Sequence, residues 1–177
     1  MTFSRCSAIL GVFLLFSGSY AIAQEDTSAT ADPQASFVAS SIDTAQETLN
    51  YALSLVGIKY KFGGKTPETG MDCSGFVRHV FHQAADMLLP HNARAISMFG
   101  KKIAIADLQP GDLVFYNTMR HAYSHVGIYL GDNRFVHASV TGRGVEVVNM
   151  KERYWTKRFN GARRVLASPS LSGFSPE

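Results

Sequence analysis

Cysteine is scarce in this chain of 177 residues, which contains only Cys6 and Cys73. Cys6 lies within a predicted signal peptide and would leave with it, so the mature chain keeps a single cysteine. One cysteine excludes an internal disulfide. Because a lone thiol in an oxidising compartment is a liability unless it is buried or used, Cys73 is either an inert core thiol or a nucleophile.

The chain also has only a small excess of positive charge. The formal net charge is +3, and the basic residues are scattered, with no run longer than pairs such as Arg163-Arg164. Nucleic-acid binding requires a stronger basic surface, so we expect no nucleic-acid partner. The hydrophobic fraction of 46% is enough for one globular core.

The apolar stretch near the N-terminus is too short for a membrane span. It covers residues 8–16, whereas a bilayer span needs roughly 20 residues. Arg5 before the stretch and Ala21-Ile22-Ala23 after it match a secretory signal peptide over 1–23. We therefore expect an exported protein, periplasmic or secreted, with no integral membrane span after cleavage.

Small and polar residues flank the predicted folded domain. Residues 24–39 are typical of a flexible linker, and residues 168–177 of a disordered tail. One domain is therefore expected over 40–167.

Hydrophobic periodicity predicts helices first and strands after them. Apolar residues at helical spacing predict helices over 42–56, 74–87 and 92–99. Short apolar runs between turns predict strands over 113–116, 125–130, 134–138, 145–148 and 159–166. This order predicts an α+β fold, with helices packed on one face of an antiparallel sheet of about five strands.

Cys73 lies between a glycine-rich loop and an amphipathic helix, in the run Asp72-Cys73-Ser74-Gly75. It is thereby placed at the helix N-terminus, where unpaired N–H groups and the helix dipole favour the thiolate. The same N–H groups can hold the oxyanion of a tetrahedral intermediate. From position alone, a buried structural thiol stays an alternative.

A nucleophilic cysteine needs a base, and the base needs an orienting group. Two of the six histidines, His79 and His82, lie beyond the first turn of the helix and point away from Cys73. His91 lies in a loop. The remaining candidates are His121, His125 and His137.

His125 and His137 lie on the two strands of a predicted hairpin whose turn centres near Asp132. Pairing across such a turn puts the two histidines nearly opposite each other, close enough for one imidazole to orient the other. A register slip of one residue would move one of them to the other face of the sheet.

These residues belong to a pattern that resembles the NlpC family of papain-like cell-wall cysteine peptidases, close to the Spr-like murein endopeptidases. Five motifs follow one another in the family's order over 45–166. They are Gly57-x-x-Tyr60-x-x-Gly63-Gly64 and the segments 72–77, 108–115, 125–129 and 135–138.

The resemblance implies a papain-like fold and a Cys-His-His thiol mechanism without metal or cofactor. Cys73 would be the nucleophile, His125 the general base and acid, and His137 the residue that orients His125. The substrate would be a stem peptide or cross-link of peptidoglycan, cleaved at an amide bond through an acyl-enzyme. The bond between D-glutamate and the diamino acid and the D,D cross-link both stay open.

The resemblance also implies that Tyr60 assists the oxyanion or the substrate, and that Asp72 and Ser74 shape the pocket near the substrate amine. Phe62 stands where the family frequently has tryptophan. The loop 116–124, which contains Arg120 and His121, has no counterpart in the motif. No separate wall-binding module is visible, and we expect a monomer.

Three other functions compete with the peptidase. A wall-binding module could keep the fold without the chemistry. A papain-like acyltransferase is a second option, although the permuted members of that class have histidine before cysteine, and here Cys73 comes first. A zinc protein could use Cys73, His121, His125 and His137 as ligands.

Overall fold

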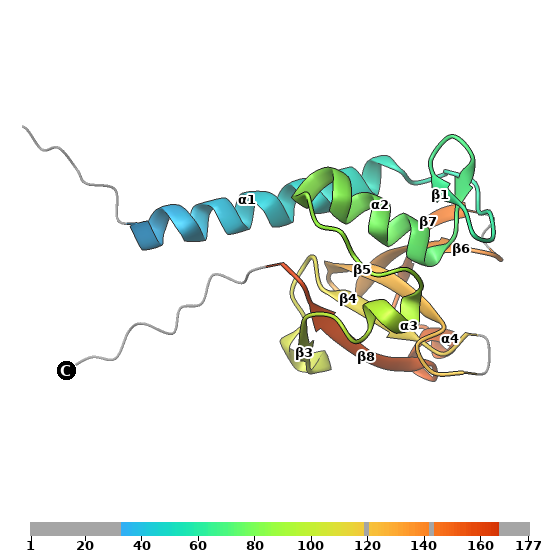
Figure 1. Cartoon of the computed structure of the whole chain (residues 1–177). Helices are drawn as coiled ribbons and strands as arrows, with labels where there is room; N and C mark the ends of the chain where they lie inside the picture. The colour runs from blue at the N-terminus through green and yellow to red at the C-terminus, as the bar shows by residue number, and fades with distance from the viewer. Residues whose placement is uncertain (1–32, 119–120, 142–143, 167–177) are drawn as a thin grey trace, which may run out of the picture. The chain divides into compact units, whose positions relative to one another are not determined.

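The computed structural model describes residues 33–118, 121–141 and 144–166 (Figure 1). The chain divides into the units Met1–Thr30 and Ala31–Glu177, and the described residues all belong to the second. The predicted signal peptide, the predicted tail 168–177, the linker residues before 33 and Arg120 lie outside the described residues.

The described residues contain helices, strands and one 3-10 helix in a mixed order. The helices are α1 (Pro33–Ser54), α2 (Cys73–Ala85), α3 (Ala93–Ile96), η1 (Ile105–Asp107) and α4 (Arg153–Thr156). The strands are β1 (Lys65–Thr66), β2 (Gly70–Met71), β3 (Lys101–Ile103), β4 (Leu113–Tyr116), β5 (His125–Gly131), β6 (Arg134–Ser139), β7 (Gly144–Asn149) and β8 (Phe159–Arg164).

The strands β3 to β8 form one antiparallel sheet, in the order β3-β8-β4-β5-β6-β7. The α+β class and the antiparallel sheet are confirmed. The sheet has six strands because β3, which the hydrophobic pattern did not reveal, pairs with β8 at one edge. The short strands β1 and β2 pair with each other in the glycine-rich loop before α2.

Helix α1 begins earlier than its hydrophobic pattern indicated. It starts at Pro33, so residues 33–39, which the composition assigned to a linker, are helical. Proline is favoured in the first turn of a helix because its missing N–H would be unpaired there anyway. Further along, the hydroxyls of Ser41 and Thr44 donate to carbonyls four residues earlier, at 2.8 and 2.9 Å. These two short polar side chains are thus satisfied within the helix.

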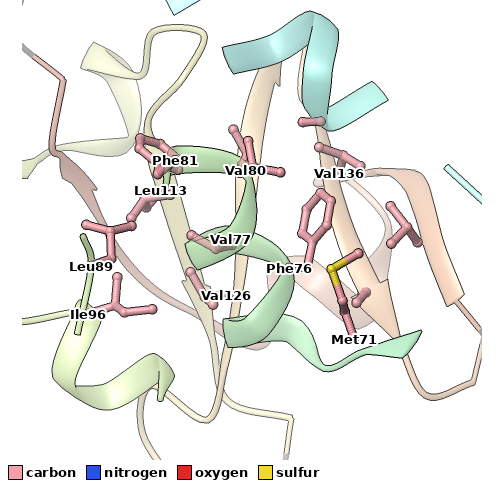
Figure 2. Packing of buried hydrophobic residues seen from close by; sticks show 14 of the residues in the cluster. Met71, Phe76, Val77, Val80, Phe81, Leu89, Ile96, Leu113, Val126 and Val136 are labelled. Atoms are coloured by element: carbon pink, nitrogen blue, oxygen red, sulfur yellow. The ribbon is translucent and has the colours of Figure 1, made fainter. Parts of the chain in front are cut away.

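One face of the sheet packs against α1 and α2. Phe76, Val77, Val80 and Phe81 are buried on α2 at helical spacing. They meet side chains from alternating positions of the strands (Figure 2), namely Leu113, Val126 and Val136. Each such side chain stabilises the fold by about 1.5–3 kcal/mol when fully buried.

The opposite face of the sheet has its own cluster, which is rich in aromatic residues. Val114 and Tyr116 of β4 point there, whereas Leu113 and Phe115 point to the helical face. Trp155 of α4 packs edge-on against the rings of Tyr116 and Phe135, with centroids 4.9 and 5.0 Å away. The short helix α4 therefore covers the face that α1 and α2 leave open.

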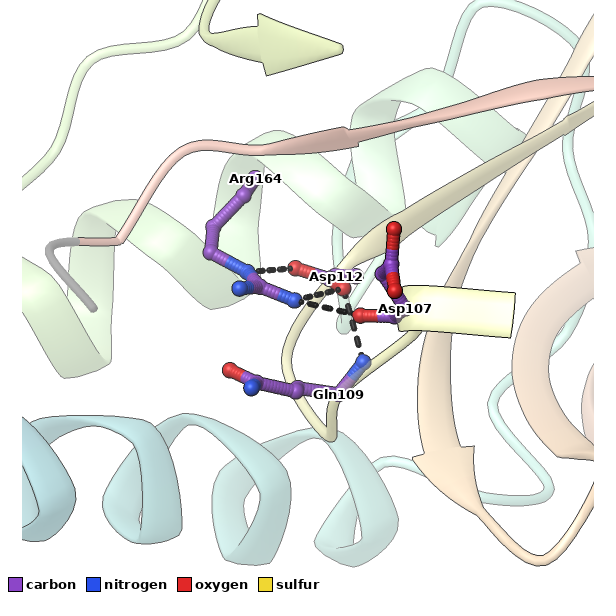
Figure 3. A network of polar contacts seen from close by, with 4 residues as sticks. All are labelled: Asp107, Gln109, Asp112 and Arg164. Carbon is purple, nitrogen blue, oxygen red and sulfur yellow. Dashed lines mark hydrogen bonds and ion pairs between the residues drawn. The ribbon is translucent and has the colours of Figure 1, made fainter. Parts of the chain in front are cut away.

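A buried ion pair joins the last strand to the turn before β4. Arg164 donates from Nε and Nη2 to the two carboxylate oxygens of Asp112, both at 2.7 Å (Figure 3). The backbone N–H of Gln109 donates to the same carboxylate at 2.8 Å, and Arg164 also donates to the carbonyl of Asp107 at 2.9 Å. Two residues of the sequence motif 108–115, Gln109 and Asp112, are thus hydrogen-bonded to each other, and Arg164 of β8 anchors the motif to the last strand.

Candidate active site

The side chain of Asp72 fixes the start of α2. One of its carboxylate oxygens accepts from the backbone N–H of Gly75 at 2.7 Å and from the Ser74 hydroxyl at 2.9 Å. The other oxygen accepts from the backbone N–H of Gly63 at 3.0 Å. Asp72 is therefore an N-cap that ties the glycine-rich loop to the helix. Cys73 is the first residue of α2, as predicted.

Close backbone contact between the loop and the helix requires glycine. A Cβ at Gly75 would collide with the carbonyl oxygen of Gly64, which also accepts from the N–H of Asp72 at 3.1 Å. This contact holds the residues on either side of Cys73 in place. Glycine is disfavoured inside a helix, and this close contact explains why Gly75 is nevertheless found in the first turn of α2.

The hairpin β5–β6 brings His125 and His137 into contact. Nε2 of His125 and Nδ1 of His137 are 2.8 Å apart, and the two ring planes cross at 84°. Asp132 and Asn133 both have positive φ in the connecting turn, which is the geometry of a tight hairpin. The predicted pairing of the two imidazoles is confirmed.

The register of the hairpin places the two histidines diagonally rather than directly opposite each other. Ile128 pairs with Val136, so continuing the ladder puts His137 opposite Gly127 rather than opposite His125. Because side chains alternate with a period of two, both histidines still lie on the same face. They are diagonal neighbours, and imidazole is long enough to bridge that separation.

Both histidines are buried against Trp155. The indole lies nearly parallel to the His125 ring at 5.9 Å and edge-on to the His137 ring at 4.9 Å. Burial lowers the pKa of His125 to about 4, although Asp72 acts in the opposite direction. Burial and the neighbouring His125 lower the pKa of His137 to about 3. Both rings are therefore neutral at neutral pH.

The surroundings of Cys73 act on the pKa of its thiol in both directions. Burial and the Asp72 carboxylate raise the pKa of Cys73 to about 11, while the backbone N–H groups of Val126, Ser74 and Cys73 act to lower it. The helix N-terminus thus acts in the expected direction, and the loss of water and the adjacent negative charge act against it. The N–H groups that favour the anion are nonetheless present.

The contact with Val126 places the sulfur beside the first residues of β5. Val126 directly follows His125, so the thiol lies at the end of the strand that carries the imidazole. Among the described residues, no hydrogen bond joins the sulfur to a ring nitrogen. Catalytic hydrogen bonds often form only when substrate binds, so this geometry is compatible with proton transfer between them.

Cys73 opens into a cleft of about 360 Å³. Residues on both sides of Cys73 and from the glycine-rich loop line one wall, among them Tyr60, Phe62, Asp72 and Ser74. The other wall consists of Asn92, Ala93, Arg94, His121, Tyr123 and Ser124. Burial, Cys73 and Asp72 all raise the pKa of Tyr60, so its hydroxyl keeps its proton and can donate.

The structure therefore brings Tyr60, Asp72, Cys73 and Ser74 together at one cleft, and it joins His125 to His137. His121, Tyr123 and Ser124, which belong to the unassigned loop 116–124, line the cleft. His79 instead contacts the Tyr51 hydroxyl of α1 at 2.9 Å, as suits a helix-packing residue.

Arg94, Tyr123 and Trp155 are among the residues around the site that sequence reasoning missed. Trp155 is the only tryptophan of the chain, and its uniqueness was the one available signal. Arg94 and Tyr123 lie on connections whose course depends on tertiary packing, so no local pattern marked them.

Neither a metal cluster nor a membrane helix is found within the described residues. No group of three or more histidine, cysteine, aspartate or glutamate side chains in 33–118, 121–141 and 144–166 could hold a metal ion. Cys73, His121, His125 and His137, the zinc ligands considered above, all lie within these ranges. No helix in the same ranges is long and apolar enough to cross a membrane.

Residues 57–164 match the family model described as the NlpC/P60 family. A relative from Escherichia coli (strain K12), named murein DD-endopeptidase MepS/murein LD-carboxypeptidase, is 40% identical over 126 residues. The match spans 71% of this chain and 65% of that protein. A gamma-DL-glutamyl hydrolase of Bacillus subtilis (strain 168) is 40% identical over 70% of this chain and 29% of its own length.

The fold is similar to that of a solved NLP/P60 family protein from Staphylococcus aureus. The TM-score is 0.64 and the sequence identity 34%, over 71% of this chain and 42% of that chain. The chain thus spans less than two thirds of the length of each of these proteins.

Proposed function

Since the chain belongs to the NlpC/P60 family, we propose that it is a peptidoglycan hydrolase that cleaves amide bonds with Cys73 as nucleophile. The observation that supports this most directly is the site itself. A cysteine at a capped helix N-terminus lines an open cleft and contacts the strand that carries His125. His125 is in turn hydrogen-bonded to the buried His137. The fold alone would not require these side chains to converge.

The first half of the reaction forms a thioester. The Cys73 sulfur attacks the scissile carbonyl carbon, and the thiol proton passes to Nδ1 of His125, the ring nitrogen that His137 does not occupy. The carbon–nitrogen bond then breaks, and His125 returns the proton to the leaving amine. Because burial and Asp72 raise the pKa of the Cys73 thiol, we propose that proton transfer to His125 accompanies the attack.

The second half restores the enzyme. Water loses a proton to His125 and adds to the thioester carbon. The carbon–sulfur bond breaks, the acid product leaves, and Cys73 recovers its proton. In both halves the backbone N–H groups at the start of α2 and the Tyr60 hydroxyl donate to the oxyanion. We assign Asp72 and Ser74 to shaping the pocket near the substrate amine, in addition to the capping role of Asp72.

The substrate is a peptidoglycan stem peptide or cross-link. The E. coli relative is named for D,D and L,D bonds, and the B. subtilis relative for a gamma-D,L-glutamyl bond. Both candidate bonds of the sequence analysis thus have a counterpart among similar proteins. A chain exported by the predicted signal peptide 1–23 would meet this polymer in the periplasm or in the cell wall, and it would act as a monomer.

Digestion of purified peptidoglycan sacculi tests the proposal. Soluble fragments are separated and identified by mass spectrometry, and new amino groups and new reducing sugar ends are counted in parallel. The proposal predicts one new amino group for each bond cut and no new reducing ends, and the fragment masses identify the bond. Release of reducing ends without amino groups, or no release by folded protein, would contradict it. A wall-binding module would bind sacculi without releasing fragments.

A further inference from the structure

His137 has a buried ring nitrogen that the proposed mechanism leaves unused. The side chain is 1% exposed, and its Nδ1 contacts His125 at 2.8 Å. Nε2 has no hydrogen-bond partner among the described residues. An unpartnered buried polar atom is costly, so it calls for an explanation.

A carboxylate faces this nitrogen from the neighbouring strand. Glu146 of β7 is the register partner of His137, and its Oε1 lies 3.7 Å from Nε2. The rings packed around His137 are those of His125, Phe135 and Trp155, and none of them offers an oxygen acceptor. The backbone of Ala138 also forms a hydrogen bond with the His137 ring, whereas Glu146 is the carboxylate that faces Nε2. The Glu146 side chain is 37% exposed, so it can move the short distance needed for a hydrogen bond.

The position of one proton on His137 decides which nitrogen of His125 can act as a base. A neutral imidazole carries a single N–H. When His137 is protonated at Nε2, its Nδ1 accepts from Nε2–H of His125, and the lone pair of His125 is left at Nδ1. When His137 is protonated at Nδ1 instead, His125 accepts at Nε2 and carries its proton at Nδ1. In that second state His125 cannot take a proton from Cys73.

We propose that Glu146 is a positioning residue that selects the first state, by accepting a hydrogen bond from Nε2–H of His137. The relay then runs from the Glu146 carboxylate through His137 to His125, and the base faces the thiol. Glu146 touches neither the substrate nor the sulfur. The effect of Glu146 on catalysis rests on the proposed function. The effect of Glu146 on the tautomer of His137 does not depend on that function.

Nitrogen NMR of the two histidines tests the proposal independently of activity. In wild-type protein labelled with ¹⁵N-histidine, we expect His137 protonated at Nε2 and His125 protonated at Nε2. In Glu146→Ala we expect the proton of His137 to redistribute toward Nδ1. Wild-type His137 protonated at Nδ1, or ring signals that Glu146→Ala leaves unchanged, would overturn the proposal even if the protein proved not to cleave peptidoglycan.

Kinetics provide the second readout. Loss of one charge-assisted hydrogen bond should lower kcat about 10-fold to 100-fold in Glu146→Ala. KM should be unchanged, since Glu146 lies away from the cleft. Glu152→Gln is the matched control, because this exposed carboxylate lies just after β7 and its side chain does not cap α4. An unchanged kcat in Glu146→Ala, or an equal loss in Glu152→Gln, would contradict the positioning role.

Discussion

The two faces of the sheet differ in what the same strands contribute to them. On the helical face, β5 and β6 present Val126, Ile128, Val136 and Ala138 to a cluster of buried apolar side chains. On the opposite face, the same strands present His125 and His137 beside an aromatic cluster. The alternation of a strand thus separates the apolar core residues from the two histidines to which we assign the proton transfer.

Cys73 connects the two faces. It belongs to the helical side by its place on α2, yet its sulfur contacts the backbone of Val126 next to His125. This comparison leads to a simple expectation. Substitutions on the helical face should lower stability, whereas substitutions of the two histidines should lower activity.

The largest expected effect is on activity, from His125→Gln. Glutamine keeps a polar side chain beside Trp155 and His137 but cannot act as a base at neutral pH. We expect the rate of wall hydrolysis to fall on the order of 10³-fold or more. Thermal unfolding should show only a small change in Tm. A variant with near wild-type turnover would show that the opposite face does not supply the base.

Phe81→Ala is the converse substitution on the helical face. Phe81 is fully buried on α2, two turns from Cys73. Removing the ring should lower the free energy of unfolding by about 3–5 kcal/mol, as measured by urea denaturation. The rate per folded molecule should stay close to wild type. A large loss of turnover in protein that is still folded would contradict the expectation that residues of the helical face act on stability alone.

Asp112→Asn breaks the buried pair with Arg164. Removing one charge of a buried ion pair costs about 3–5 kcal/mol in severe cases, and asparagine can retain part of the hydrogen bonding. We expect a loss toward the lower end of this range, measured by urea denaturation. Asp132→Asn is the control, because it removes a carboxylate from the pair Arg134–Asp132, whose side chains are 56% and 89% exposed. A similar loss of unfolding free energy in both variants would show that burial does not make the Asp112–Arg164 pair more stabilising than the exposed pair.

The stability of the fold should also depend on pH. The pKa of His125 is lowered to about 4 and that of His137 to about 3, below the ordinary value of about 6.5. The unfolded chain therefore binds protons that the folded chain does not. The stabilisation is complete above pH 6.5 and is lost as the pH falls toward these values, by about 1.4 kcal/mol per pH unit for each histidine.

His137→Asn isolates one of these two contributions. Urea denaturation between pH 6.5 and 4.5 should give a slope that is shallower by about one proton than in wild type. Asparagine can still accept a hydrogen bond from His125 through its side-chain oxygen. Equal slopes in the two proteins would mean that His137 is not held neutral by burial.

The hairpin and the start of α2 could be predicted because local signals determine them. Gly131-Asp132-Asn133 marks the turn, and Asp72 before an apolar helical stripe marks the cap. These two elements carry Cys73, His125 and His137, so the places of these residues in the fold could be predicted from the sequence.

Features that depend on distant contacts could not be predicted. Strand β3 offers a three-residue pattern, and its pairing with β8 joins residues about sixty positions apart. Its exposed lysines suit an edge strand but do not reveal one. The protonation state of Cys73 depends on how much water the surrounding fold excludes. The early start of α1 was hidden by a composition that is also typical of linkers.

The rate at which Cys73→Ala releases fragments from purified sacculi tests the central claim most directly. The measurement compares this variant with wild type at equal concentrations of folded protein, with circular dichroism as the check on the fold. We predict that wild type releases peptide fragments with new amino groups and that Cys73→Ala releases none above background. Fragment release by Cys73→Ala at a rate close to wild type would contradict a thiol mechanism.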